Sequence, residues 1–321
     1  MHRNEFPYVQ TPARRAGVCE NLIYHAKWIQ SRSKVRSMKK KFVFLSSLLC
    51  AVLLLCACGK GESAPVETVD PYAGMVQVES GFGTLMWVEK YEELPVNALT
   101  AADFSDGEYL GDCYRVRRGV DVSEHQGEID WAAVRENGIE FAVLRAGYRG
   151  YGEAGVLRRD DFFLYNVNGA AENGIDMGVY FFSQATDVAE AEEEAEFLLD
   201  ILSLYTVDTF TLPVYYDWEA IDQDEARTDG MTGEAITACA AAFCEKIAAA
   251  GYDAGIYAYR NLGYFSYDLR ALKDYSLWIG AAGEYPDFYY AHELWQYSYT
   301  GTVPGINTPV DLDLLFEKIE A

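Results

Sequence analysis

Two carboxylates close a strongly apolar stretch in the second half of the chain. The segment LPVYYDWEA, residues 212–220, begins like a buried strand and ends with Asp217 and Glu219 on either side of Trp218. Because side chains alternate along a strand, the two acids point to one side, about 7 Å apart, and Trp218 points to the other. Mutual repulsion and removal from water would raise at least one pKa. A protonated acid beside an ionised one is the arrangement that glycoside hydrolysis requires.

Further acids stand at the ends of other predicted strands. Asp121 occurs in GVDVS, and Asp311 and Asp313 occur in PVDLD. A single Asp after a strand is commonly a helix N-cap or a turn former, so one such acid carries little information. Three acidic strand ends together favour a site, because chemistry in a barrel gathers at the C-terminal ends of its strands. The hypothesis requires these acids and the 217/219 pair to converge on one hollow.

Aromatic side chains accompany the acids. The chain holds 24 Tyr and 6 Trp, and several lie near predicted strand ends, among them Tyr180, Phe182 and Trp295. Flat rings that stack on sugar faces, with carboxylates and hydroxyls gripping the ring oxygens, would make a carbohydrate groove. Core packing explains most such aromatics equally well. The aromatic content therefore supports a sugar site without establishing one.

The elements that must position these residues begin near Arg118. Short apolar runs alternate with helical ones, and predicted helices end at Gly138, Gly174 and Gly251, as helices with glycine caps do. Near-continuous apolar strands with helical crossovers indicate a parallel sheet covered on both faces. Eight strand candidates in about 200 residues predict a (β/α) barrel of TIM type. The helices thin out after the fifth strand, so the barrel is expected to be irregular there.

The charge distribution excludes one class of partner. Residues 1–57 hold 10 of the 26 Lys and Arg and only two acids, so the remainder carries 16 bases against 48 acids, a balance of −32. A polyanion of this strength repels nucleic acid and anionic lipid, so nonspecific binding to either is disfavoured. The acidic balance is otherwise interpreted as a solvated surface.

The N-terminal segment has the features of a targeting signal. In residues 38–57 three lysines precede an apolar run of 16 residues, shorter than the ~20 that a spanning helix needs. This pattern predicts a secretory signal, and its end, LCAC before Gly59, resembles a bacterial lipoprotein signal. The resemblance implies cleavage before Cys58, a lipid on its sulfur, and a membrane-anchored, extracytoplasmic protein of the cell envelope. An ordinary signal or a short anchor is the alternative. Residues 1–37 are interpreted as an over-extended start.

The predicted mature chain divides into three parts. Residues 58–74 form a polar, flexible tether, residues 75–116 a small β-rich region, and residues 117–321 the barrel. We expect no cofactor and no metal, because only two histidines remain and no metal-ligand spacing is present. Besides Cys58, the remaining cysteines are Cys113, Cys239 and Cys244, and nucleophilic catalysis by cysteine has no support in the sequence.

The order of motifs in this region resembles glycosyl hydrolase family 25, the bacterial and phage N-acetylmuramidase lysozymes. The opening RRGVDVSEHQGEIDWAAVRENGIEFAVLRAGY carries the family's Asp-Val-Ser, Gln-Gly and Ile-Asp-Trp order. The family's Asp-x-Glu matches Asp217 and Glu219, its WQYS matches residues 295–298, and its closing Val-Asp-x-Asn corresponds to residues 310–313. Four motifs in order and spacing are specific, although each alone is weak. The departure is Asp313, where the pattern has Asn.

The resemblance implies a fold and a chemistry. It implies five β/α units followed by three further strands, and cleavage of the β-1,4 bond between N-acetylmuramic acid and N-acetylglucosamine in peptidoglycan with net retention. Glu219 would be the acid/base and Asp217 the second carboxylate, which either attacks the anomeric carbon or orients the substrate's 2-acetamido group. The flanking acids would be Asp121 and Asp311. The expected substrate contacts are Tyr180, Tyr216, Trp295 and Gln296.

Two other functions fit the same pattern. A non-catalytic wall-binding lipoprotein could use the same barrel, and a different glycosidase could act on another aminosugar polymer, as a chitinase or transglycosylase-like enzyme does. The expected partners are peptidoglycan and, through acylated Cys58, a lipid membrane; no nucleic acid is expected, and the protein is taken to be a monomer.

Overall fold

The computed structural model describes residues 70–319 apart from 82, 106–107 and 223–224. The predicted signal segment, Cys58 and most of the predicted tether lie outside the described residues. The described chain from Asp70 onward belongs to one compact unit. Within the described part, no helix has the length and apolar character needed to cross a membrane.

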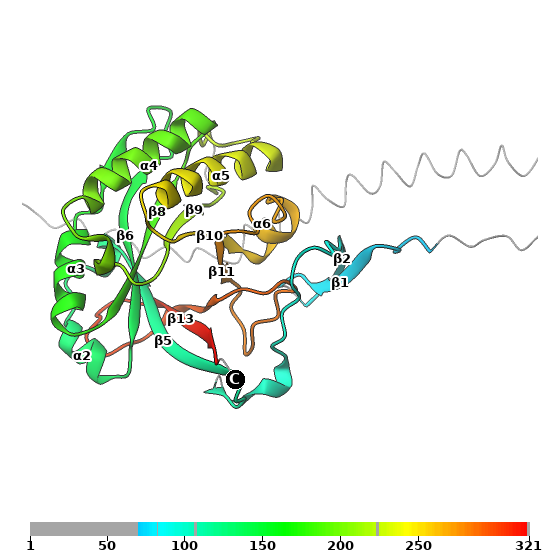
Figure 1. The fold of residues 1–321 in the computed structure, drawn as a ribbon, viewed down its shortest axis with the longest axis horizontal. Coiled ribbons are helices and arrows are strands. Elements are labelled where there is room, and N and C mark those ends of the chain that lie inside the picture. The colour runs from blue at the N-terminus through cyan, green and yellow to red at the C-terminus, as the bar shows by residue number, and fades with distance from the viewer. Residues whose placement is uncertain (1–69, 82, 106–107, 223–224, 320–321) are drawn as a thin grey trace, which may run out of the picture. The chain divides into compact units, whose positions relative to one another are not determined.

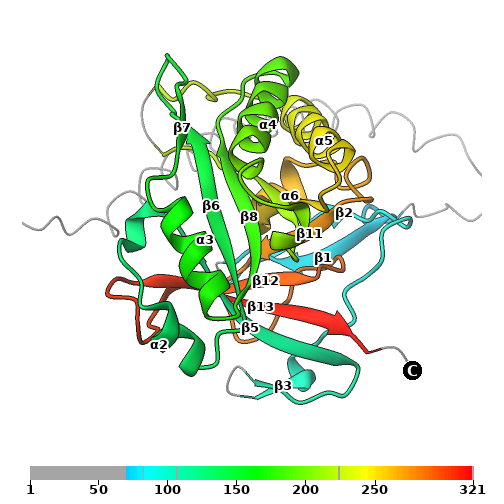
Figure 2. The ribbon, with the colours of Figure 1, turned by 60° about the vertical axis from the view of Figure 1, so that its left-hand side comes forward.

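A closed barrel organises the described chain (Figures 1 and 2). Its eight strands are β5 (Tyr114–Val122), β6 (Phe141–Arg149), β8 (Asp176–Ser183), β9 (Val214–Trp218), β10 (Ala254–Tyr259), β11 (Ser276–Gly280), β12 (Leu294–Gly301) and β13 (Val310–Lys318). Seven run parallel in chain order, and β13 closes the barrel by pairing antiparallel with both β12 and β5. The short strand β7 (Leu157–Arg159) is not one of the eight barrel strands and pairs antiparallel with residues 147–149 at the end of β6. The prediction of a parallel sheet therefore holds for every barrel strand but the last.

Helices follow the first five barrel strands. They are α2 (Trp131–Glu136), α3 (Phe163–Glu172), α4 (Val188–Leu202), α5 (Gly233–Ala249) and α6 (Arg260–Phe265). In the described chain β11, β12 and β13 succeed one another without an intervening α-helix, so the predicted irregular barrel of five β/α units and three further strands is confirmed. The glycines expected to end helices lie two residues beyond α2, α3 and α5 with positive φ of 84°, 63° and 93°, a conformation that favours glycine.

Alternation along the strands separates two apolar layers. One lies inside the barrel and includes Phe141, Tyr215 and Trp278. The larger layer lies between the strands and their covering elements and includes Tyr216 and Trp218 from the same strand as Tyr215. Because neighbouring residues of a strand face opposite sides, each strand contributes to both layers.

The N-terminal region covers the strands that lack helices. It contains the hairpin β1 (Met75–Glu79) and β2 (Leu85–Glu89), the 3₁₀ turn Ala101–Asp103, and the short pair β3 (Phe104–Ser105) and β4 (Glu108–Tyr109). The other 3₁₀ turns are Glu124–Gln126 and Val207–Thr209. Phe104 meets the rings of Trp295 on β12 and Phe316 on β13 edge-on, at centroid distances of 6.0 and 6.2 Å. This region thus takes the place of the missing helices on the outer face of β12 and β13.

A buried ion pair joins β6 to α4. The Nε of Arg149 donates to Glu194 at 2.7 Å, and the Glu194 side chain is fully buried. A second carboxylate, Glu193, also accepts from Arg149 at 2.7 Å, but its side chain is 59% exposed. Burial raises the pKa of Glu194 to about 7 although the guanidinium opposes the shift. Removal of one partner would therefore leave the other buried without a counter-charge, which lowers the stability of the folded protein.

Replacing Arg149 by Met should lower the free energy of unfolding by about 3–5 kcal/mol at pH 8, because it strands the Glu194 carboxylate in the protein interior. Replacing Glu193 by Gln at the exposed end of the same guanidinium should cost less than about 1 kcal/mol. Urea unfolding monitored by tryptophan fluorescence measures both. Equal losses in the two variants would contradict this assignment.

Candidate active site

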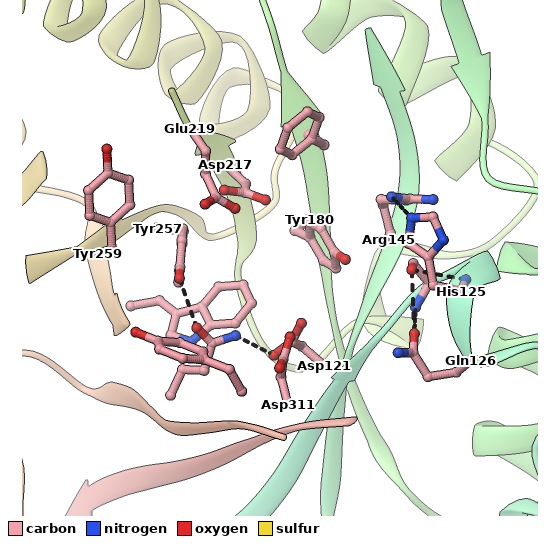
Figure 3. Close-up of a pocket in the computed structure, with 15 residues that line it drawn as sticks. Asp121, His125, Gln126, Arg145, Tyr180, Asp217, Glu219, Tyr257, Tyr259 and Asp311 are labelled. Atoms are coloured by element: carbon pink, nitrogen blue, oxygen red, sulfur yellow. Dashed lines mark hydrogen bonds between the residues drawn. The ribbon is translucent and has the colours of Figure 1, made fainter. Parts of the chain in front are cut away.

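A pocket of about 580 Å³ opens at the end of the barrel where the parallel strands terminate. Side chains from all eight barrel strands or the residues just after them line it, including Asp121, Tyr180, Asp217, Tyr257 and Asp311 (Figure 3). The volume is within the range of pockets that hold small molecules or a few sugar rings. The floor of the pocket is formed by the apolar layer inside the barrel, since Trp278 belongs to that layer and also lines the pocket.

The four predicted acids converge on this pocket. Asp217 lies on β9 and Glu219 directly after it, and both line the pocket (Figure 3). Asp121 on β5 and Asp311 on β13 are direct cross-strand neighbours and line it too. Within the described chain none of the four acids forms an ion pair with Lys or Arg. The convergence on which the sequence hypothesis depended is therefore present.

Asp311 reaches the pocket in a way that differs from the prediction. It was expected at the C-terminal end of a parallel strand, but it is the second residue of the antiparallel strand β13. Since β13 runs opposite to its neighbours, its beginning lies where their ends lie. Reversal of this one strand therefore brings an N-terminal Asp to the same rim.

Burial raises the pKa values of these acids, since none of them is paired with a cation. The pKa of Glu219 is raised to about 7, first by burial and then by the charge of Asp311. Burial followed by the charge of Glu219 raises the pKa of Asp217 well above its usual range, while Arg145 opposes the shift. Burial raises the pKa of Asp311 to about 6. At neutral pH the pocket therefore retains at least one acidic proton beside ionised carboxylates.

A chain of hydrogen bonds fixes the inner side of the pocket. The hydroxyl of Tyr257 donates to Oε1 of Gln296 at 2.8 Å, and Nε2 of Gln296 donates to Oδ2 of Asp121 at 2.7 Å (Figure 3). Gly280 leaves room for this chain, because a Cβ there would lie 2.3 Å from the Tyr257 hydroxyl oxygen. The amide of Gln296 is thereby oriented with its oxygen toward Tyr257 and its nitrogen toward Asp121.

One positive charge stands in the wall. Arg145 on β6 lines the pocket, and its guanidinium is held by Asp160 at 2.8 Å and Glu124 at 3.1 Å. It also lies over the ring of Tyr148, 5.0 Å from the ring centroid. Because these contacts hold it in place, Arg145 acts on Asp217 as a fixed charge that favours the ionised form.

Of the four predicted substrate contacts, the structure brings two to the pocket and places two elsewhere. Tyr180 and Gln296 line the pocket as expected, but Tyr216 and Trp295 do not. Tyr216 packs on Phe243 of α5, and its hydroxyl oxygen accepts a hydrogen bond from the Ser183 hydroxyl at 2.8 Å. Trp295 is buried in the outer layer, and its indole N–H donates to the carbonyl of Ala281 at 2.8 Å. Each adjoins a pocket residue, so strand alternation sends it to the opposite side.

Several pocket residues were missed by sequence reasoning. They are Ser123, His125, Gln126, Arg145, Tyr257, Tyr259, Trp278 and Tyr299. Tyr257 and Tyr259 both lie on β10, two residues apart, so strand alternation places them on the same face and the sequence could have indicated this. Trp278 pairs with Tyr257 in the sheet register and packs on its ring at a centroid distance of 4.7 Å. No local pattern distinguishes these aromatics from core residues.

Nothing in the described residues is arranged as a metal centre, since they contain no group of three or more His, Cys, Asp or Glu side chains able to hold an ion. The cysteines of the described chain, Cys113, Cys239 and Cys244, are unpaired, and the last two are buried in α5. The polar groups that line the pocket are carboxyls, hydroxyls, the amides of Gln126 and Gln296, the imidazole of His125 and the guanidinium of Arg145.

Known proteins share this region of the chain. A family model described as glycosyl hydrolases family 25 matches residues 120–306. The chain is 28% identical over 204 residues to the autolytic lysozyme of Clostridium acetobutylicum, covering 63% of this chain and 56% of that protein. It is 27% identical to lysozyme M1 of Streptomyces globisporus, covering 60% of this chain and 66% of that protein. The chain thus spans only part of the length of either relative.

The solved structure of a bacterial lysozyme from Streptomyces coelicolor has a similar fold. It is 25% identical, with a TM-score of 0.50 over 61% of this chain and 90% of that one. The similarity supports the irregular α/β barrel.

Replacing Asp311 by Asn should lower the pKa of Glu219 from about 7, because it removes the neighbouring charge that helps to raise it. Carboxyl-carbon NMR titration of the folded protein measures the shift directly. Asp200→Asn, on the exposed face of α4, is the matched control and should leave the Glu219 titration unchanged. An unchanged Glu219 pKa in Asp311→Asn would show that burial alone sets it.

Proposed function

Because this chain belongs to glycosyl hydrolases family 25, we propose that it is a lysozyme-type glycoside hydrolase that cleaves peptidoglycan at the β-1,4 bond between N-acetylmuramic acid and N-acetylglucosamine. The observation that carries the proposal is the meeting of Asp121, Asp217, Glu219 and Asp311 in one pocket without paired cations. A raised acid beside other carboxylates supplies the proton and the negative charge that glycosidic cleavage needs.

Glu219 is the proposed acid/base. Its pKa of about 7 lets it keep a proton at neutral pH, which it gives to the leaving glycosidic oxygen as the bond to the anomeric carbon breaks. The resulting carboxylate then takes a proton from the water that completes hydrolysis, so that the residue returns to its starting state. Burial is the main cause of the raised pKa, and the charge of Asp311 adds to it.

Asp217 is the proposed second carboxylate. It is almost fully buried, and within the described chain its Oδ1 is a buried atom without a hydrogen-bond partner. Asp217 either attacks the anomeric carbon itself or accepts the N–H of the substrate's 2-acetamido group, whose oxygen then attacks. Both routes pass through two displacements and give net retention. The fixed charge of Arg145 favours the ionised form of Asp217 in either route.

The remaining pocket residues have positioning roles in this proposal. Asp121 and Asp311 face each other across β5 and β13 and hold sugar hydroxyls while adding negative charge beside the developing oxocarbenium ion. Tyr180 and Gln296 contact the substrate. Trp278 and Tyr257 present an aromatic floor, and rings of this kind stack on the apolar faces of sugars.

Two other functions make different predictions for the same pocket. A non-catalytic wall-binding protein would bind peptidoglycan and release nothing from it. A glycosidase of another aminosugar polymer would not produce new reducing ends that carry muramic acid. The family match and the intact set of acids favour the hydrolase, and analysis of the new reducing ends separates these possibilities.

Replacing Glu219 by Gln should reduce the release of soluble muropeptides from purified peptidoglycan by about 10²–10⁴-fold, because the amide cannot donate the proton. Mass spectrometry of the products measures the release, and reduction with borohydride identifies muramic acid at the new ends. Glu245→Gln, an exposed change on α5, is the matched control and should keep full release. Wall binding without release by the unmodified protein would support the binding function instead.

The location of the protein is a separate proposal. The segment 38–57 and the LCAC end before Gly59 support lipidation of Cys58 and anchoring to the membrane, with the barrel outside the cytoplasm. Tethering by the first mature residue would confine hydrolysis to wall close to the membrane, which suits a role in remodelling.

Replacing Cys58 by Ala in the full-length chain should move the protein from the membrane fraction to the soluble fraction, because no thiol remains to carry the lipid. Fractionation with immunodetection measures the distribution, and Cys113→Ala is the matched control. Unchanged fractionation of Cys58→Ala would leave an ordinary signal or a short anchor as the explanation.

A further inference from the structure

A fifth acid, Asp313, lies beneath the pocket and does not line it. It follows Asp311 by two residues on β13 and points into the same side of the barrel, one layer deeper, beside Gln296 of β12 and Gly119 of β5. Its side chain is fully buried, with 0% of the residue exposed. In the described chain no Lys or Arg forms an ion pair with it. A full negative charge at this position would be costly.

The hydrogen bonds around Asp313 account for only one of its oxygens. Its Oδ1 accepts from the indole N–H of Trp278 at 2.9 Å. Its Oδ2 is buried and receives no N–H or O–H from any neighbour. Asp121 follows Gly119, the register partner of Asp313, by two residues on the same face of β5, and Gln296, the partner of Asp313 on β12, donates to Oδ2 of Asp121 at 2.7 Å. Two carboxyl groups therefore meet, and each already has one conventional donor.

Two carboxylates in contact repel each other, whereas one carboxyl and one carboxylate form a strong charge-assisted hydrogen bond. We infer that Asp121 and Asp313 share a single proton across neutral pH, and that Asp313 is a positioning residue that holds Asp121 in the pocket through this bond. The shared proton satisfies the otherwise orphaned oxygen and leaves the pair with one negative charge instead of two. This inference concerns the state of the pair; its consequence for catalysis rests on the proposed function.

The chain of contacts gives the proton a defined place. Tyr257 donates to Gln296, Gln296 donates to Asp121, and Trp278 donates to Asp313, so all other donors in this network are already committed. Neither Gln296 nor Trp278 can lose a proton at accessible pH. The contact between the two acids is then the one position in this network that a titratable proton can occupy.

The titratable and charged groups around the pair come from six strands. They are Asp311 on β13, Tyr215 on β9, Tyr257 on β10, Tyr297 on β12, Tyr180 on β8 and, farther out, Arg145 on β6. The tyrosines are neutral at physiological pH, since burial raises the pKa of Tyr180 and Tyr215 well above the usual range. Burial also raises the pKa of Asp313 to about 8 and that of Asp121 well above its usual range. The surroundings therefore favour retention of the proton.

Asp313 stands where the motif of residues 310–313 has an asparagine, and the two side chains differ in how they can bond to Asp121. The family pattern to which residues 310–313 correspond has Asn at the last position, and an amide would offer a permanent N–H to Asp121 while its oxygen accepted from Trp278. Asp313 can make the same two contacts only when a proton lies between it and Asp121. The aspartate version is thus expected to be sensitive to pH where an amide would not be.

The experiment compares the thermal midpoints of the unmodified protein and Asp313→Asn from pH 5 to pH 9. An unfolded Asp releases its proton near pH 3.9, whereas the folded pair keeps one up to about pH 8. The stability that the raised pKa contributes is complete below the unfolded value and is lost as pH rises to the folded one. Asp313→Asn lacks this loss, so its midpoint should rise relative to the unmodified protein by about 5 °C or more across this range.

Two further variants keep the test decisive. Asp121→Asn removes the same shared proton from the other side and should show the same relative rise, and the double variant should show no further pH-dependent gain, because only one proton is involved. Asp200→Asn, on the surface of α4, should follow the unmodified protein at every pH. The infrared band of a protonated carboxyl at pH 7 should lose intensity in Asp313→Asn and not in Asp200→Asn. A midpoint difference that stays constant from pH 5 to pH 9, or unchanged infrared intensity, overturns the inference.

The positioning role has its own measurement. If Asp313 orients Asp121, release of muropeptides at pH 6 should be retained in Asp313→Asn, which keeps both hydrogen bonds, and reduced in Asp313→Ala, which keeps neither. Equal loss in both variants contradicts the positioning role. Absence of release by the unmodified protein contradicts the proposed hydrolase instead, and it leaves the thermal and infrared results to decide the state of the pair.

Discussion

Removal of carboxyl groups from water, without cations to pair with them, is the constraint on which the rest of the site depends. Asp121, Asp217 and Asp313 are buried, and Glu219 and Asp311 border them at the rim of the barrel. Elsewhere in the described chain buried acids such as Glu194 and Asp160 are paired with arginines. The acids of the site differ from these in having no arginine partner. Burying them lowers the stability of the folded protein, which the surrounding packing must offset, and the same burial raises their pKa values.

The barrel supplies that packing from both sides. Inside, Trp278, Tyr257 and Tyr215 fill the layer beneath the pocket, and Gly280 keeps one position open for the hydrogen bond between Tyr257 and Gln296. Outside, α4 and α5 cover the strands that carry Tyr180 and Asp217 (Figure 1). The N-terminal region covers β12 and β13 where no helix follows them. The rings of Phe104 and Tyr109 thus support β12 and β13, the strands that position Gln296, Asp311 and Asp313.

Reversal of the last strand links fold to chemistry. Because β13 is antiparallel to β5 and β12, Asp311 enters the pocket from the beginning of a strand, and Asp313 follows it one layer down. The same pairing sets Asp311 beside Asp121 and Asp313 beside Gln296. Three acids and one amide from the two ends of the barrel sequence thereby lie side by side, although the two motifs are separated by about 190 residues in the sequence.

The sequence by itself determined the order of strands and helices, the glycine ends of α2, α3 and α5, and the side of β9 on which Asp217 and Glu219 lie, because these follow from periodicity and local backbone geometry. It also indicated the meeting of four acids, since motif order resembled a known family. Strand alternation also implies that Tyr216 and Trp295 face away from their pocket neighbours, Asp217 and Gln296. Only the tertiary structure decided that Tyr257 and Trp278 form the floor, that β13 is antiparallel, and that Asp313 lies next to Asp121. Those outcomes depend on strand direction and on contacts between residues far apart in the chain, about which local pattern carries no information.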